Sequence, residues 1–129
     1  ARLHDAGLIV SAFLDADRRQ IEAASQVGFD VCEVHTGPYA HAFARAGSDF
    51  RKDDLAEAFD EVVRAGALIV EAGMRFNAGH ALNYANVVPV AGLPGLAELH
   101  IGHAIVSRAV FVGLRNAVAQ MKFCMRAQD

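Results

Sequence analysis

The sequence has few cysteines, no long apolar runs and no large excess of one charge, and each absence excludes a class of protein. Its two cysteines, Cys32 and Cys124, are too few for a disulfide framework or a cysteine metal site, and we expect both to be inert packing residues. No uncharged apolar run approaches the length of a membrane span. The net charge is −3, with acidic and basic residues interspersed, so electrostatics gives no reason to expect nucleic-acid or membrane-surface binding.

The composition is that of one folded domain. The 129 residues are 53% hydrophobic and 21% charged, which is too apolar for a disordered segment. The length predicts a single domain over residues 1–129. No charged-then-apolar targeting signal opens the sequence, so we expect a cytoplasmic protein.

Short apolar strands alternate with helices along the chain. Strands are predicted at 8–14, 30–35, 74–79 and 96–101. Helices are predicted from a cap at Asp17 to Gly28, at 51–72, at 83–88, and over about 20 residues from 103. Residues 39–50 are predicted to form a long connection, which is a candidate lid or binding loop. This alternation predicts a parallel sheet with right-handed crossovers.

Two architectures fit four such units, a small doubly wound sheet and half of a (β/α)8 barrel. A complete barrel needs roughly 200 residues or more, so the chain is too short for a whole one. Polar residues spaced by two fall within the strands: Glu33 and His35, Arg75 and Asn77, Glu98 and His100. Each pair shares one face of its strand, and unpaired buried charges cost several kcal/mol. A barrel interior lets such groups pair with one another, so we predict an α/β fold of four βα units that form the second half of a TIM barrel.

Both architectures bind ligands at the carboxyl ends of their strands, where the sequence twice has Gly-His. Gly102 and His103 lead into a helix, and a glycine there lets an anion approach the free N–H groups of the helix start. The alternative is a plain turn without a ligand. His80, after Gly79, can move protons near neutral pH. Its alternative is a hydrogen-bonded structural histidine.

Glu33 lies within a predicted strand, so it must be paired, bound to a metal, or positioned for chemistry. Arg75 or His35 would neutralise it in a purely structural network. No helix carries an H-x-x-x-H or H-E-x-x-H spacing, so no metal site is predicted. A zinc site from Glu33, His35, His80 and His103 remains a geometric alternative.

The predicted C-terminal helix is apolar around most of its circumference. Its polar side chains Arg108, Arg115, Lys122 and Arg126 fall largely on one stripe, whereas a helix packed on one barrel needs only one apolar face. The surplus predicts a second contact, either with another subunit or with a further part of the same molecule. We therefore expect a homo-oligomer.

Four segments resemble the pyridoxine 5′-phosphate synthase family, in that family's order. They are AGLIVSAFLDAD from Ala6, EVHTGPYA from Glu33, NAGHALNYANV from Asn77 and ELHIGHAIVSRA from Glu98. The resemblance covers essentially the whole chain and only the second half of the family's (β/α)8 barrel. It implies condensation of 1-deoxy-D-xylulose 5-phosphate with 3-amino-2-oxopropyl phosphate, without metal or organic cofactor, in a cytoplasmic octamer.

The same resemblance implies roles for five residues. His80 matches a proton donor and Glu33 a transition-state stabiliser, while Ala81, Gly102 and His103 match positions that bind the amino-ketone phosphate. The family commonly has glycine at the position of Ala81, so the backbone contact there is expected to be altered.

The family's proton-accepting histidine and glutamate, and its basic residues for the pentulose phosphate, have no counterpart in these 129 residues. We therefore expect the chain to be a segment of a longer polypeptide, inactive alone. Two alternatives stay open: another phosphate-binding barrel, such as an isomerase or aldolase, and a non-catalytic module that binds a phosphate ester.

Overall fold

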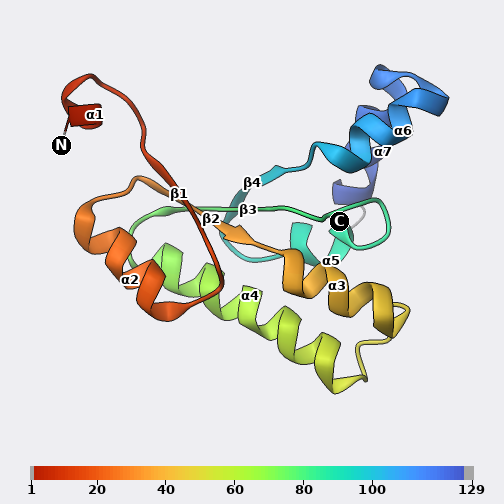
Figure 1. Cartoon of the computed structure of the whole chain (residues 1–129), viewed down its shortest axis with the longest axis horizontal. Helices are drawn as coiled ribbons and strands as arrows, with labels where there is room; N and C mark the ends of the chain where they lie inside the picture. The colour runs from red at the N-terminus through yellow and green to blue at the C-terminus, as the bar shows by residue number, and fades with distance from the viewer. Residues whose placement is uncertain (1, 127–129) are drawn as a thin grey trace.

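A computed structural model describes residues 2–126. The strands are β1 (Ser11–Leu14), β2 (Val31–His35), β3 (Arg75–Gly79) and β4 (Leu96–His100). The helices are α1 (Arg2–Asp5), α2 (Arg18–Val27), α3 (Gly37–Ala46), α4 (Asp53–Glu71), α5 (Val87–Ala91), α6 (His103–Val112) and α7 (Leu114–Arg126). Figure 1 shows their arrangement.

The four strands form one parallel sheet in the order β1-β2-β3-β4. In a doubly wound sheet the strand order reverses at a switch point between two strands, and this sheet has no such reversal. Because right-handed crossovers that all advance the same way bring their helices to one face, α2, α3 and α4 lie together on one side of the sheet (Figure 1). On the other side Phe13 of β1 is 55% exposed. The order is that of a partial (β/α)8 barrel, as predicted.

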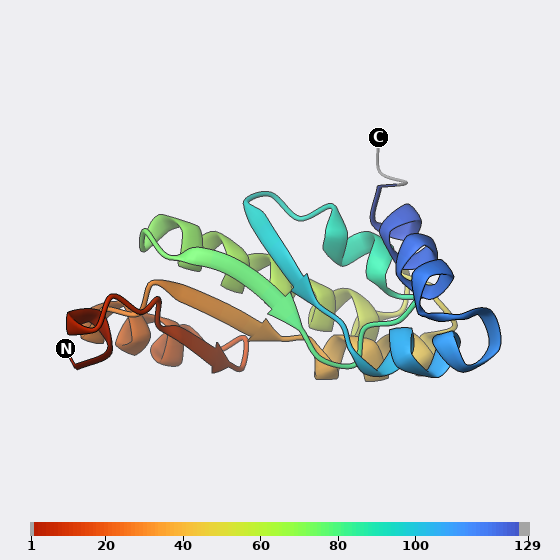
Figure 2. The same cartoon turned by 90° about the horizontal axis from the view of Figure 1, so that it is seen from above.

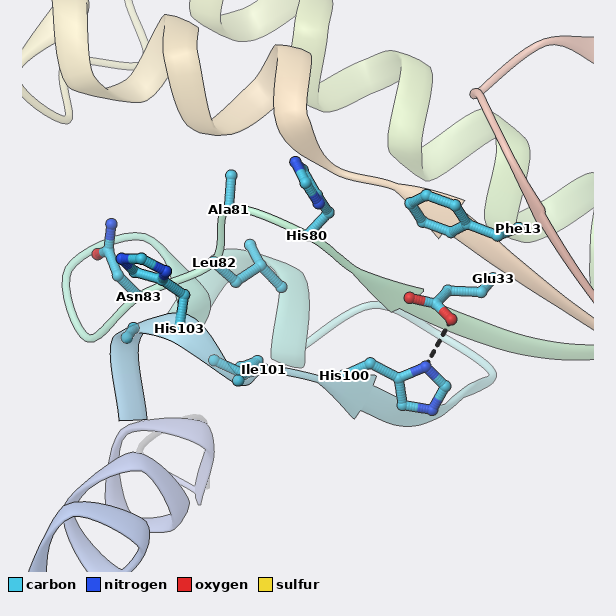
Figure 3. A pocket seen from close by; sticks show the side chains of 11 residues that line it. Phe13, Glu33, His80, Ala81, Leu82, Asn83, His100, Ile101 and His103 are labelled. Atoms are coloured by element: carbon cyan, nitrogen blue, oxygen red, sulfur yellow. Dashed lines mark hydrogen bonds and ion pairs between the residues drawn. The ribbon is translucent and has the colours of Figure 1, made fainter. Parts of the chain in front are cut away.

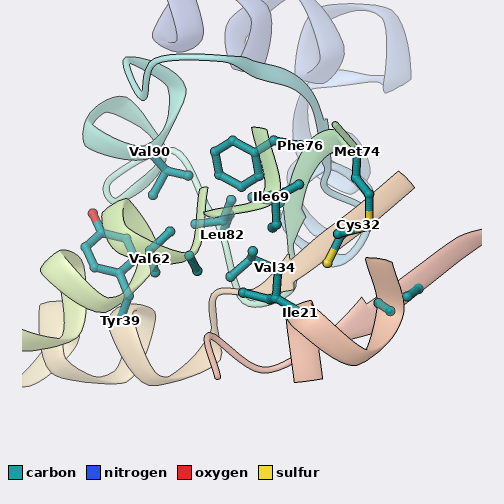
Figure 4. Packing of buried hydrophobic residues seen from close by; sticks show 14 of the residues in the cluster. Ile21, Cys32, Val34, Tyr39, Val62, Ile69, Met74, Phe76, Leu82 and Val90 are labelled. Carbon is teal, nitrogen blue, oxygen red and sulfur yellow. The ribbon is translucent and has the colours of Figure 1, made fainter. Parts of the chain in front are cut away.

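The hydrophobic core lies between the sheet and this layer of helices. Alternate side chains of the central strands point into it, among them Cys32, Val34 and Phe76, all at most 1% exposed. Residues such as Ile69 of α4 pack against them from the helix side (Figure 4). Apolar side chains therefore take the helix-facing positions of the strands, which leaves the polar ones to the opposite face.

The ends of α2 follow the predicted signals. The Asp17 carboxylate accepts hydrogen bonds from the backbone N–H groups of Arg19 at 2.9 Å and Gln20 at 3.1 Å. Gly28 closes the helix in the left-handed region, with φ +84°. Both ends of this helix were therefore readable from its sequence.

The prediction of a long connection at 39–50, a candidate lid or binding loop, is wrong, because most of that segment belongs to α3. Pro38 lies in the first turn of α3, where its missing N–H costs no helical hydrogen bond. Gly47, with φ +65°, ends the helix. Tyr39 is fully buried, and its ring lies against the ring of Phe59 on α4. α3 is thus a packed element of the helical layer.

Three other predicted boundaries also differ. β1 begins at Ser11 and not at residue 8. α5 contains Pro89 and does not end before it, because Pro89 lies in the first turn of that short helix. Gly113, with φ +80° and ψ 150°, divides the predicted long C-terminal helix into α6 and α7.

The apolar surface predicted for this region is exposed. α6 has no buried residue, and Val110, Phe111 and Phe123 are 80%, 85% and 75% exposed. α6 and α7 lie apart from the layer of α2, α3 and α4, beyond the end of β4 (Figures 1 and 2). Within residues 2–126, none of the helices combines the length and apolar character needed to cross a membrane.

Two neighbouring valines of α4 test the core. Val62 is 2% exposed and Val63 is 36% exposed. We expect Val62→Ala to lower the free energy of unfolding by about 2 kcal/mol, because buried methyl groups are lost and a cavity remains. Val63→Ala, the matched control, should change it by less than about 0.5 kcal/mol. Equal effects in urea denaturation would contradict this assignment of the core.

The two cysteines should differ in reactivity. Burial and the neighbouring Glu33 charge raise the pKa of the Cys32 thiol to about 11. Cys124 is only partly buried. Because the thiolate is the reactive form, a thiol reagent at pH 8 should label Cys124 and leave Cys32 unmodified in the folded protein, whereas denaturant should expose both. Rapid native labelling of Cys32, located by mass spectrometry, would contradict the packing described.

Candidate functional site

A cavity of about 680 Å³ opens at the carboxyl ends of the strands (Figure 3). All five residues that the sequence analysis selected line it: Glu33, His80, Ala81, Gly102 and His103. They come from β2, from the segment after β3, and from the start of α6. The cavity is completed by Phe13, Leu82, Asn83, His100, Ile101 and Ala104. The structure therefore brings the selected residues together in one place.

His80 and Ala81 lie in a tight left-handed turn after β3, with φ +78° and +60°. L-residues rarely adopt this conformation without support from their surroundings. The buried Thr36 supplies it, because its hydroxyl oxygen lies 2.7 Å from the carbonyl oxygen of Gly79 and 2.6 Å from that of His80. The turn is thus tied to the end of β2.

Asn86 holds the other side of the same turn. Its side-chain NH2 donates to the Ala81 carbonyl at 3.2 Å, and its Oδ1 accepts from the Asn83 N–H at 2.7 Å. Asn86 is 2% exposed, and its own carbonyl accepts from the Tyr39 hydroxyl at 2.8 Å. Buried hydrogen bonds therefore fix the backbone that carries His80.

The His80 ring packs on other rings. Its centroid lies 4.6 Å from that of His35 and 6.3 Å from that of Phe13. His35 is anchored in turn, because its Nδ1 lies 3.2 Å from Asp15 Oδ1. A Cβ on Gly37 would lie 2.7 Å from His35 Nε2, so only glycine leaves room for this ring at the start of α3.

Glu33 pairs with His100 of β4, and not with Arg75 or His35. Its Oε2 lies 2.6 Å from His100 Nδ1 (Figure 3), and the Glu33 side chain is only 17% exposed. The hydrogen bond to Glu33, and more weakly the nearby Glu98, raise the pKa of His100, while desolvation opposes the shift.

The alternative in which Arg75 or His35 neutralises Glu33 is therefore wrong. His35 pairs with Asp15, and the Arg75 guanidinium donates to Glu98. The reason is the gap at Gly79, the residue of β3 that pairs with His100: a Cβ there would collide with Glu33 Oε1. Glycine thus lets Glu33 reach across β3 to β4.

The start of α6 faces the cavity without a side-chain cap. A Cβ on Gly102 would meet no atom within 4 Å, so this glycine leaves open space beside the helix start. Uncapped N–H groups and the helix dipole favour an anion at such a position.

The alternative zinc site does not assemble. Across residues 2–126, no three His, Cys, Asp or Glu side chains lie so that they would hold a metal ion together.

Several residues of the site were missed from sequence. Thr36 follows a strand in the segment HTGP, which marks a turn but not a hydroxyl that reaches the next strand. The spacing of two between Glu98 and His100 indicates that both lie on the same face of the strand. It does not indicate that His100 pairs with Glu33. Asn86 carries no local signal, because its contacts depend on how the turn at His80 folds back.

Comparisons with known proteins converge. The family model described as pyridoxal phosphate biosynthesis protein PdxJ matches residues 1–127. The chain is 60% identical to the pyridoxine 5′-phosphate synthase of Azoarcus sp. (strain BH72), over 98% of the chain and 51% of that protein. It is 60% identical to that of Dechloromonas aromatica (strain RCB), over 98% and 50%, and 49% identical to that of Rhodopirellula baltica, over 93% and 46%. The chain thus spans about half the length of the curated relatives it matches.

The left-handed turn can be tested at Ala81. Ala81→Gly should raise the free energy of unfolding by up to about 1 kcal/mol, because glycine relieves the steric cost of φ +60°. Ala67→Gly, at an exposed position inside α4, is the matched control and should lower it by about 1 kcal/mol. Chemical denaturation of both variants measures the difference, and a loss of stability in both would contradict the turn geometry.

Proposed function

Because the chain belongs to the family described as pyridoxal phosphate biosynthesis protein PdxJ, we propose that it forms half of a pyridoxine 5′-phosphate synthase barrel. The reaction condenses 1-deoxy-D-xylulose 5-phosphate with 3-amino-2-oxopropyl phosphate and releases inorganic phosphate and water. The observation that carries the proposal is that all five residues selected from sequence line one cavity.

Each residue has a role that its position supports. His80 donates a proton to an oxygen that leaves as water, since a histidine can carry a proton near neutral pH. The Glu33 carboxylate stabilises positive charge that develops on the substrate nitrogen. Gly102, His103 and the backbone at Ala81 bind the amino-ketone phosphate, and the uncapped start of α6 supplies N–H donors for it. No metal or organic cofactor takes part in this proposal.

The remainder of the barrel is part of the same proposal. The inner face of the sheet holds Asn77, whose buried Oδ1 has no hydrogen-bond partner within residues 2–126. Buried amide oxygens are nearly always paired, which supports a further group facing this strand. We propose that four more βα units close the barrel here and supply the groups that accept protons and bind the pentulose phosphate.

The assembled enzyme is proposed to be a cytoplasmic homo-oligomer. The exposed apolar side chains of α6 and α7, Phe111 above all, support a contact that covers them. An octamer is the state that the family resemblance implies.

Reconstitution tests the function. We expect no turnover from the 129-residue chain alone, and pyridoxine 5′-phosphate when it is co-expressed with the first half of the Azoarcus relative. Chromatography of the product with both substrates present measures this. Turnover by the chain alone would contradict the need for a second half, and binding of phosphate esters without condensation would favour the non-catalytic alternative.

His80→Asn in the reconstituted barrel should lower kcat by about 100-fold or more, because a positioned proton donor is lost. Substrate binding should change little. His41→Asn, at an exposed position of α3 outside the cavity, is the matched control and should keep full activity. Full activity in His80→Asn would remove this histidine from the mechanism.

A further inference from the structure

A series of charged side chains of alternating sign crosses the inner face of the sheet. Glu33 of β2 contacts His100 of β4 at 2.6 Å through Nδ1. The other ring nitrogen of His100, Nε2, lies 3.5 Å from Glu98 Oε2, and the other oxygen of Glu98 accepts from the Arg75 guanidinium. The series therefore runs carboxylate, imidazole, carboxylate, guanidinium.

Both nitrogens of the His100 ring face carboxylates, which favours the ring that carries protons on both. A neutral ring keeps one N–H and donates to only one of the two. The raised pKa of His100 agrees with this arrangement, and Glu33 is its largest cause.

Glu33 is the member of the two carboxylates that lines the cavity, and it is the less exposed one, at 17% against 50% for Glu98. Its Oε1 lies over Gly79, and its Oε2 is held by His100. Removal of the histidine would leave a largely buried carboxylate without its cation, free to rotate in the space over the glycine. The placement of Glu33 thus depends on His100.

We propose that His100 is a positioning residue: held between Glu98 and Glu33, it fixes the Glu33 carboxylate in the cavity in the orientation that the reaction uses. Glu98 anchors the second nitrogen of the ring, and Arg75 balances Glu98. This inference rests on the proposed function, because it assigns His100 to the same site.

The pH dependence follows from the groups that face His100. These are Glu33 from β2, Arg75 from β3 and Glu98 from β4, with His80 and His103 across the cavity. The folded pKa of His100 is raised, so its stabilising pairing is complete below the unfolded value of about 6.5 and is lost as the pH rises through the folded value. Glu33 should then lose its fixed orientation on the alkaline side.

Imidazole NMR on the 129-residue chain tests the charge series without any need for turnover. We expect the pKa of His100 to lie above its ordinary value, because the hydrogen bond to Glu33 favours the ring that carries protons on both nitrogens. Glu33→Gln should lower that pKa toward 6.5, and Glu98→Gln should lower it less. His4, which pairs with Asp30 at 2.8 Å away from the cavity, is the internal control and should not respond to Glu33→Gln. A His100 value that Glu33→Gln leaves unchanged would overturn the proposal.

Kinetics of the reconstituted barrel tests the positioning role. His100→Gln should lower kcat roughly 100-fold, with both KM values within about threefold of wild type, and should remove the alkaline decline assigned to His100. His4→Gln loses a comparable histidine–carboxylate pair outside the cavity and is expected to keep kcat. A purely structural His100 would destabilise the fold on substitution yet leave kcat and the pH profile of the folded enzyme intact, which would overturn the proposal.

The two failures are distinguishable. If the wild-type barrel does not condense the two substrates, the proposed function fails and His100 has no reaction to serve. If the wild type is active and His100→Gln is equally active, only the inference about His100 fails.

Discussion

Right-handed crossovers in a sheet of sequential strand order constrain the rest of this structure. With no reversal in the order β1-β2-β3-β4, the helical layer forms on one face of the sheet. The strands therefore have one apolar side toward the helices and one side that faces away from them. Cys32 and Val34 point to the helices, while Glu33 between them points the other way. The alternation of side chains along each strand therefore directs one set of residues into the core and the other set toward the site.

Side-chain contacts between nearby strands hold the site together. Thr36, directly after β2, fixes the turn after β3 that carries His80. Glu33 of β2 crosses over β3 to His100 of β4. The strands pair as neighbours, with one register shift between β3 and β4 at Phe76 and Asn77. These contacts therefore need only one or two strand spacings, and side chains far apart in sequence meet at the same edge of the sheet. The backbone pairing of the sheet thus determines the geometry of the cavity.

The sequence predicted the four strands, the cap at Asp17 and four of the residues that share the cavity, because periodicity and strand ends are local signals. The fifth cavity residue, Ala81, was expected only from the family resemblance. It failed for α3, where Pro38 resembles a helix breaker but lies in a first turn that tolerates it. It also failed for the partner of Glu33. That contact depends on the empty space over Gly79, which no pattern of residue types reveals. Local sequence patterns therefore predicted most helices and strands, whereas the side-chain contacts of the site depend on tertiary packing.

Gly79 has no Cβ, and the space that this leaves is bordered by Glu33 and His100. Glu33 occupies the volume that any Cβ there would need, and His100 lies at the far border of the same volume. A larger residue at 79 would displace the Glu33 carboxylate and press on the backbone oxygen and Cβ of His100. It would therefore be compatible only with a shorter acid at 33 and a shift of the β4 backbone. Glycine at 79 and glutamate at 33 should consequently vary together or not at all as related sequences diverge.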